Sequence, residues 1–401
     1  MVIDKIKHFI FILLCTYLVG VCYCQRMEGV GLVRGLGSLY RFHKFIMCFS
    51  HKNRHIFSYF PLVVLYFGQV FGTFACLIDP MIYKSLGIMD RSEVADVILM
   101  FDKIIVTFWL SAIIIINFCK RNIHRKLLEV IFEYESAIKN TFQTQIIFRN
   151  VHSNGQFYSL TIYYLVAVVY QVIFFFGTPY AVIRMIYFIA IYFIHVNSIY
   201  LANFILCLAR EVDSLNRIIH QNVVHQPLKR LVSVKKKLKA FILITKFIKI
   251  INGANDNFGF NVLINLITTI IALSYYLYFF AWVATESLEI KVKLIITSTD
   301  FLFILPFIFV VFFLTRNGQI CVKSIEKLEN IVKETLMDPH PAVRLNGRRI
   351  AYRSQHQAIR IMAHLYQLDY RFIIYMINFI TTNVIILVQF KQLEEARHRG
   401  H

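Results

Sequence analysis

The chain of 401 residues is 58% hydrophobic and 15% aromatic, and its mean hydropathy is +0.59. Charged residues make up 16% of it, below the roughly 25% of an average soluble domain. A net charge of +20 would suggest nucleic acid as the partner of a soluble protein, but no nucleic-acid-binding motif is present and the charges lie between apolar segments. These values exclude a soluble domain and predict a polytopic membrane protein with no nucleic-acid partner.

Seven apolar segments are long enough to span a bilayer, because about 20 apolar residues in a helix cross about 30 Å of hydrocarbon. Gly177 and Pro179 are expected to form a tight turn between the third and the fourth. The predicted fold is therefore all-α with seven transmembrane helices, at 56–78, 97–119, 157–178, 179–209, 258–285, 294–315 and 372–390.

The distribution of Lys and Arg predicts the orientation of these spans. Residues 1–56, 120–156, 210–257 and 316–371 hold 34 of the 43 Lys and Arg residues, whereas the segments on the opposite side hold 7. Because cytoplasmic loops are enriched in these residues, we expect a cytoplasmic N-terminus and an extracellular C-terminus.

The apolar segment 8–24 is not one of the seven predicted spans, and it needs a separate interpretation. It is only marginally long, and Lys5 and Lys7 precede it as in a signal peptide. Cleavage would place the mature N-terminus outside and break the charge pattern. We interpret the segment as a re-entrant or interfacial helix in preference to an eighth span.

Five regions follow from the spans. Residues 1–55 form a cytoplasmic N-terminal region, 56–315 a six-helix ligand-binding bundle, 316–371 cytoplasmic anchor helices, 372–390 the seventh span, and 391–401 a short extracellular tail. Apolar residues at helical spacing in 231–248 and 322–336 indicate helices that either lie on anionic lipid or continue the spans inward as a bundle. A further helix is expected from about Ala342 into the last span.

The chain shows none of the residue patterns that mark enzymes or metal sites. It has no Ser/His/Asp arrangement, no phosphate-binding glycine loop and no paired-acid site. His51 and His55 are spaced four apart, but no carboxylate or cysteine completes a set of ligands. The eight cysteines include no CxxC pair. We therefore expect no enzymatic activity, no cofactor and no bound metal.

Polar residues recur near the end of the last span. Thr382, Ile385, Ile386 and Gln389 are spaced i, i+3, i+4 and i+7, and so share one stripe of a helix. Polar groups that face lipid are costly, which indicates that the stripe faces protein or water. Interhelical hydrogen bonds and a water-filled pore both satisfy this condition.

This stretch resembles the signature of insect gustatory receptors, which is Thr-Tyr, five hydrophobic residues and Gln-Phe at the end of the last span. Here it reads Thr382, Asn383, the segment 384–388, Gln389 and Phe390, and "HLYQLDY" at 364–370 resembles the segment upstream of that signature. Asn383 replaces the tyrosine and weakens any role carried over from that aromatic residue. The divergence favours the bitter or aversive branch over the sugar and carbon dioxide branches.

The resemblance implies a ligand-gated cation channel of the plasma membrane, assembled as a homotetramer or as a heterotetramer with other gustatory receptor subunits. It implies a pore lined by the last span, with Thr382 and Ile385 in the lining, Ile386 as the constriction and Gln389 as a ring of amides. It also implies a pocket for a small-molecule tastant in the outer half of the first six spans.

Aromatic residues in the second to sixth spans are the candidate ligand contacts, because small apolar ligands favour aromatic pockets with few polar anchors. Aromatic residues are also common in membrane helices without any such role. The candidates are Trp109, Tyr170, Phe174, Tyr180, Tyr187, Tyr192, Tyr275, Tyr276, Tyr278 and Trp282.

Asp300, an acid inside the sixth span, is expected to pair with Lys103 or Arg184 as a structural tie in preference to anchoring a ligand.

Two other function classes remain open at this point. A secondary transporter of about eight spans would show paired halves with broken helices, and the chain has no such repeat. A metabotropic seven-helix receptor would have the opposite orientation. An extracellular C-terminus would exclude the metabotropic receptor.

Overall fold

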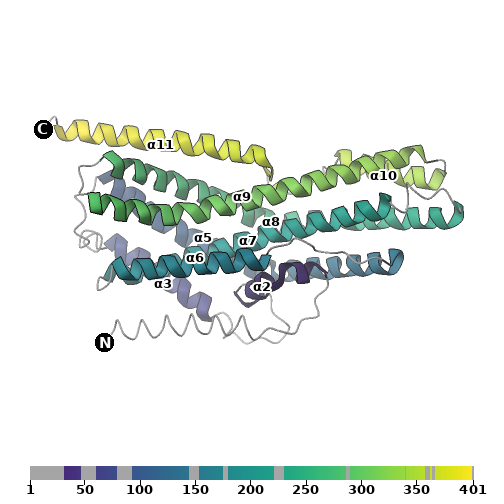
Figure 1. Cartoon of the computed structure of the whole chain (residues 1–401), viewed down its shortest axis with the longest axis horizontal. Coiled ribbons are helices and arrows are strands. Elements are labelled where there is room, and N and C mark those ends of the chain that lie inside the picture. Colours follow the sequence, from purple (N-terminus) through teal and green to yellow (C-terminus); the bar gives the residue numbers. More distant parts are fainter. Residues whose placement is uncertain are drawn as a thin grey trace.

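The structure is a computed structural model, and it describes residues 31–46, 60–78, 93–143, 153–174, 179–220, 230–285, 290–338, 340–356, 362–363 and 366–399. The segment 8–24 and the pair His51 and His55 lie outside these ranges, so the predictions made for them are not tested. Within the described ranges the chain is almost entirely helical, as the sequence predicts (Figure 1).

The helices lie side by side along the long axis of the molecule (Figure 1). In chain order the elements are α2 (Gly31–Ile46), α3 (Phe60–Ile78), α5 (Glu93–Phe142), α6 (Ser153–Phe174), α7 (Pro179–Ile219), α8 (Arg230–Thr285), α9 (Ile290–Glu334), the 3₁₀ helix η3 (Thr335–Met337), α10 (Pro341–His356), the strands β1 (Met362–Ala363) and β2 (Tyr366–Gln367), and α11 (Tyr370–Arg399).

Several of the described helices are long and apolar enough to cross a membrane, so the chain is a multi-pass membrane protein. Helix α3 has a shorter apolar stretch, Val63–Ala75. The total of seven spans and the orientation remain predictions. The long apolar stretches, five among the described helices, are Lys103–Lys120, Met185–Ile219, Val234–Ala284, Asp300–Met337 and Tyr370–Leu393.

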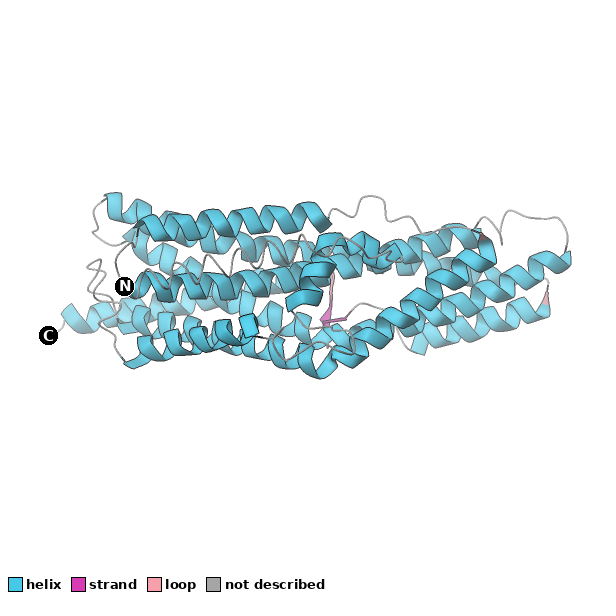
Figure 2. Cartoon of the chain, turned by 90° about the horizontal axis from the view of Figure 1, so that it is seen from below, coloured by secondary structure: helices cyan, strands magenta, loops and turns pink. Residues whose placement is uncertain are grey.

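Four helices continue far beyond the thickness of a bilayer. Helices α5, α7, α8 and α9 have 50, 41, 56 and 45 residues, and each residue adds about 1.5 Å of length. Figure 2 shows that these extensions run on as a helical bundle at the end of the molecule away from the C-terminus. Of the two alternatives for the basic segments, the structure shows continuing helices, and α10 packs against the ends of α8 and α9.

Helix α7 forms the centre of the bundle. Its apolar stretch is 78% buried, whereas that of α11 is 17% buried. It packs most extensively against α9 and also contacts α2, α3, α5, α6 and α8. A helix that is apolar around its whole circumference is stable only when protein or lipid surrounds it, and here the neighbouring helices do so.

The expectation of one helix from about Ala342 into the last span is wrong. Helix α10 ends at His356, and β1 and β2 then pair antiparallel with Met362 opposite Gln367. Asp369 begins the next helix, since its Oδ1 accepts hydrogen bonds from the backbone N–H groups of Arg371 (2.9 Å) and Phe372 (3.4 Å). An aspartate at this position satisfies N–H groups that have no partner within the helix.

Candidate functional site

A group of rings fills the centre of the bundle where α5, α6, α7, α8 and α9 meet. We call it the aromatic cluster. Every ring in it is buried, and a chain of ring contacts connects them. Its members are Trp109 of α5, Tyr164 of α6, Tyr187 and His195 of α7, Tyr276 of α8, and Phe303 and Phe307 of α9.

Helix α9 supplies the middle of the aromatic cluster. The Phe303 ring stacks on Tyr276 with centroids 5.1 Å apart and an interplanar angle of 9°. The Phe307 ring meets His195 edge-on at 4.6 Å and lies 6.4 Å from Trp109. Stacked and edge-on pairs are the favourable geometries for aromatic rings, so the cluster is a well-packed core as well as a candidate site.

The polar atoms of the cluster mostly bond to one another or to nearby amides. Trp109 Nε1 donates to Asn265 Oδ1 at 2.6 Å, and Tyr164 Oη lies 2.5 Å from His195 Nδ1. The hydroxyls of Tyr187 and Tyr276 are 3.2 Å apart. A buried site of this kind recognises small aromatic or weakly polar molecules better than it recognises charged ones.

One cation lies against the cluster. Lys103 is 4% exposed, and its Nζ is 3.3 Å from the centroid of the Tyr187 ring, which is cation–π geometry. Asp300, one helical turn before Phe303 on α9, is also 4% exposed. The tie between Asp300 and Lys103 or Arg184 remains a prediction, and the side chain of Arg184 is not described.

The predicted ligand contacts divide into groups. Trp109, Tyr187 and Tyr276 belong to the aromatic cluster, and Tyr192 reaches it through Tyr164 at 5.3 Å. Tyr170 lies at the edge of the bundle with its hydroxyl 2.7 Å from Ser298 Oγ. Tyr275 reaches the aromatic cluster through Tyr276, with ring centroids 4.9 Å apart, whereas Tyr278 and Trp282 are buried further along α8. The side chains of Phe174 and Tyr180 lie outside the described set.

Four members of the cluster are not among the ligand contacts predicted from the sequence: Tyr164, His195, Phe303 and Phe307. A signal was present for one of them, because His195 is an ionisable residue inside an apolar segment, and such residues are functional candidates. Asn265, the partner of Trp109, gives a related signal, since it is a polar residue inside an apolar segment.

A second buried group, which we call the polar layer, joins α2, α5, α7 and α8. The His43 ring stacks on Tyr200 at 3.6 Å, and its Nε2 lies 3.0 Å from Asn197 Oδ1. Tyr200 Oη is 3.2 Å from Nε2 of His124, whose Nδ1 is 2.9 Å from Asn257 Nδ2. Burial lowers the pKa of His43 to about 3, although the hydrogen bond from its Nε2 to the Asn197 amide oxygen acts in the opposite direction. Burial, with His43 nearby, also lowers the pKa of His124, so both rings are neutral at physiological pH.

Two carboxyl groups lie together near the start of α2. Oε1 of Glu135 accepts a hydrogen bond from the backbone N–H of Leu32 at 2.8 Å. Glu211 of α7 is adjacent to Glu135. Burial raises the pKa of Glu135, while the backbone N–H groups of Leu32 and Gly31 act to lower it. Two carboxylates this close cannot both be ionised without a large cost, so the pair holds one proton between them.

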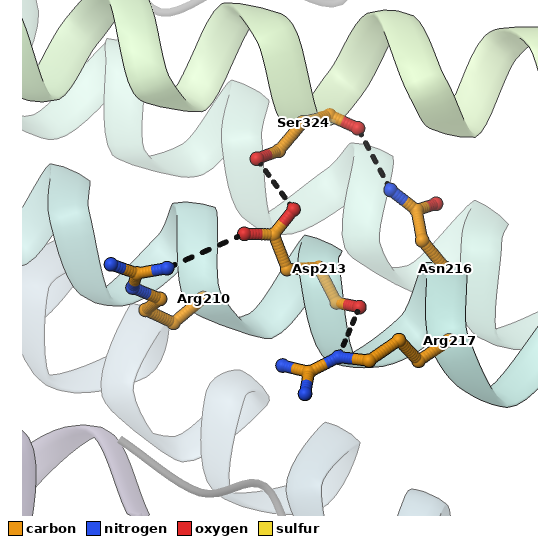
Figure 3. A network of polar contacts seen from close by, with 5 residues as sticks. All are labelled: Arg210, Asp213, Asn216, Arg217 and Ser324. Carbon is orange, nitrogen blue, oxygen red and sulfur yellow. Dashed lines mark hydrogen bonds and ion pairs between the residues drawn. The ribbon is translucent and has the colours of Figure 1, made fainter. Parts of the chain in front are cut away.

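Polar contacts join α7 to α9 in the C-terminal parts of both helices (Figure 3). Ser324 Oγ donates to Asp213 Oδ1 at 2.7 Å, and Asn216 Nδ2 donates to the Ser324 carbonyl at 2.9 Å. Asn317 Nδ2 donates to the Ala202 carbonyl at 2.8 Å. These bonds cross between the helices, so we expect the two helices to move as one unit here.

Helix α11 runs along the outside of the bundle (Figure 1). Phe372, Met376 and Ile380, spaced four residues apart, form its buried face and pack towards α8 and α9. The predicted stripe lies elsewhere on the helix. Its four residues, Thr382, Ile385, Ile386 and Gln389, are all exposed in the single chain. Among the contacts described, the one hydrogen bond of Thr382 Oγ1 is donated within the same helix, to the Asn378 carbonyl.

Among the described residues, no three side chains of His, Cys, Asp or Glu gather closely enough to hold a metal ion. The cysteines whose side chains are described, Cys119, Cys207 and Cys321, are free thiols.

Comparison with known proteins gives one family and one fold. The sequence model of the family described as 7tm Chemosensory receptor matches residues 34–394. The structure of insect olfactory receptor OR5 from Machilis hrabei in complex with eugenol is similar, with a TM-score of 0.60 and 12% sequence identity, over 90% of this chain and 99% of that chain. A second structure of this receptor has a TM-score of 0.54 and 12% identity, over 85% and 92%. No curated protein matches the chain.

Proposed function

Since the chain belongs to the 7tm chemosensory receptor family, we propose that it is a gustatory receptor subunit that forms a cation channel opened by small-molecule tastants. The tastants are bitter or aversive compounds, on the grounds of the divergent Asn383 in the terminal signature. The subunit works in the plasma membrane with its N-terminus in the cytoplasm.

The observation that carries this proposal is the arrangement of α11. One face of the helix packs on the bundle, and the stripe with Thr382, Ile386 and Gln389 is exposed in the single chain. An amide that faces lipid is unfavourable, so this stripe needs water or another subunit beside it. Four copies around an axis, as a homotetramer or a heterotetramer, supply both, with Ile386 as a hydrophobic constriction and Gln389 beside it.

The aromatic cluster is the proposed tastant site. It presents aromatic surface with a few hydroxyl and amide groups, which suits small aromatic molecules. The similar structure of the olfactory receptor was determined with eugenol, a small phenol, and supports this ligand class. Ligand at Phe303 and Phe307 would move α9, which also contacts α11.

Electrical recording tests the proposal. The chain is expressed in cells, alone and with other subunits of the family, and whole-cell current is measured during a screen of small aromatic tastants. We expect an inward current that disappears when external cations are replaced by a large impermeant one. A response that needs a G protein, or tastant uptake without channel current, would overturn the channel assignment in favour of a metabotropic receptor or a transporter.

A further inference from the structure

The segment before α11 lies against α9 at Gly318. A Cβ atom built on Gly318 would lie 2.4 Å from the carbonyl oxygen of Leu368 and 2.7 Å from its Cβ, well below the 3.0 Å that real Cβ atoms keep. Because the nearest atom belongs to the backbone, no rotation of a side chain relieves the overlap. Only glycine permits this approach of the two segments.

On one side of this contact is the start of α11. Leu368 is fully buried, and Asp369 directly after it caps the helix. The backbone N–H of Asp369 donates to the Gln367 carbonyl at 3.1 Å, and that of Phe372 donates to the Asp369 carbonyl at 3.2 Å. A displacement of Leu368 therefore displaces the first turn of α11.

On the other side is the helix that carries the middle of the aromatic cluster. Gly318 lies 11 residues after Phe307, about 16 Å along the same helix. Pro306 lies inside α9 beside Phe307, and a proline there removes one backbone hydrogen bond and favours a bend at that point. Asn317, next to Gly318, is bonded to Ala202 of α7, so this part of α9 moves with α7.

We propose that Gly318 is the positioning residue through which α9 controls α11, and that its close contact with Leu368 holds the channel closed. Tastant in the aromatic cluster shifts α9 at Pro306, which loosens the contact and releases the first turn of α11 to tilt. This inference rests on the proposed channel function and adds the residue that links the tastant site to the pore.

The test is Gly318→Ala in the full chain, assembled with the subunits that give the parent current. The added methyl carbon would lie 2.4 Å from the carbonyl oxygen of Leu368, so the two segments must separate until these atoms are at least 3.0 Å apart. We expect the current without tastant to rise several-fold and the half-maximal tastant concentration to fall about tenfold. The cation permeability ratios should stay unchanged, because the pore lining is untouched.

The matched control is Gly347→Ala. Its Cβ would lie 2.8 Å from Thr335 Oγ1, an overlap with a side-chain atom between α10 and η3 and away from α11. This variant measures what a steric clash costs in surface expression alone, and its half-maximal concentration should equal that of the parent. Gly155→Ala, where no atom lies within 4 Å, is the neutral reference.

If Gly318→Ala does not reach the cell surface, Leu368→Gly addresses the same contact by removing the Cβ atom that faces Gly318, and it should also raise the current without tastant. A parent-like response in both Gly318→Ala and Leu368→Gly, equal to that of the Gly347→Ala control, would overturn the positioning role and leave the channel assignment intact. A higher half-maximal concentration in Gly318→Ala would overturn it too, since the contact would then belong to the open state. A parent chain without tastant-gated current in any subunit combination would overturn both proposals.

Discussion

Ile386 and Gln389 are the residues on which the proposed pore depends, and the structure leaves both exposed in the single chain. A ring of isoleucines resists wetting, and a dry constriction blocks ions without physical occlusion. We expect Ile386→Ser to produce a tastant-independent leak, and Gln389→Arg to suppress cation current at least tenfold by placing a positive charge from each subunit beside the constriction.

Patch-clamp recording with surface labelling checks this prediction. Ile374→Ser is the matched control, because Ile374 is also exposed on α11 but lies about 120° around the helix from Ile386. If Ile386→Ser and Gln389→Arg conduct like the parent at equal surface density, the stripe forms interhelical contacts and α11 does not line the pore.

The pair Glu135 and Glu211 predicts a pH dependence of stability. Burial raises the pKa of Glu135 above its ordinary value of 4.5, so the folded chain holds a proton that the unfolded chain releases. The contribution of this group to the free energy of unfolding is therefore greatest when the pH is below the ordinary pKa of 4.5, and it falls as the pH rises through the raised pKa. The melting temperature of the purified protein should fall over this range, and Glu211→Gln should flatten the slope. An unchanged slope in that variant would show that the two groups do not share a proton.

Individual site residues were only partly predictable from the sequence. Trp109, Tyr187 and Tyr276 were named as ligand contacts and lie in the aromatic cluster. Phe303 and Phe307 were missed because the sequence has many phenylalanines in apolar segments, and no spacing within α9 tells which of them face Tyr276 and His195 on other helices. That choice is made by packing between helices, which sequence periodicity does not encode.

At the scale of elements, one ion pair ties the start of α8 to the segment between η3 and α10. Lys237 Nζ lies 2.5 Å from Asp338 Oδ2, with side chains 16% and 9% exposed. Burial acts to raise the pKa of Asp338, but the hydrogen bond from Lys237 and the backbone N–H of His340 outweigh it and lower the pKa. The ion pair therefore stabilises the fold when the pH is above 3.8, the ordinary pKa of an aspartate, and this stabilisation is lost as the pH falls through the lowered pKa.

We expect Asp338→Asn to loosen the start of α10 without unfolding the bundle. Hydrogen exchange of residues 341–346 should become faster, equivalent to a loss of about 1 kcal/mol in local opening free energy. Glu129→Gln is the control, because the pair of Arg125 and Glu129 is well exposed and contributes little. Equal exchange in the parent and in Asp338→Asn would show that other contacts hold this end of α10.

Helices were easier to predict than the segment between α10 and α11. The long apolar segments carry a strong signal, and the predicted spans correspond to α3, α5, α6, α7, α8, α9 and α11. The pair of β1 and β2 has two residues in each strand, too few for an alternating pattern to show. The contact between Gly318 and Leu368 joins residues far apart in sequence and could not be foreseen.

For the whole molecule, the orientation in the membrane is the central prediction. The C-terminus and α10 lie at opposite ends of the long axis (Figure 1), which agrees with placing them on opposite sides of the membrane. A glycosylation acceptor added after His401 through a spacer should be modified, because only 7 of the Lys and Arg residues lie on that side. An acceptor inserted beside Lys236 should remain unmodified, and the reverse pattern would contradict the orientation.

Because little of α11 is buried, the lipid around it can influence its tilt. With 17% of its apolar stretch covered, against 78% for α7, its tilt is set less by its own subunit than by what surrounds it. Tilt is one way in which a helix adjusts to a bilayer whose thickness differs from its own apolar length. Lipid acyl-chain length would then act as a modulator of the receptor in its own right. The same tastant dose would open the channel to different extents in thin and thick membranes, while the central helices kept their arrangement.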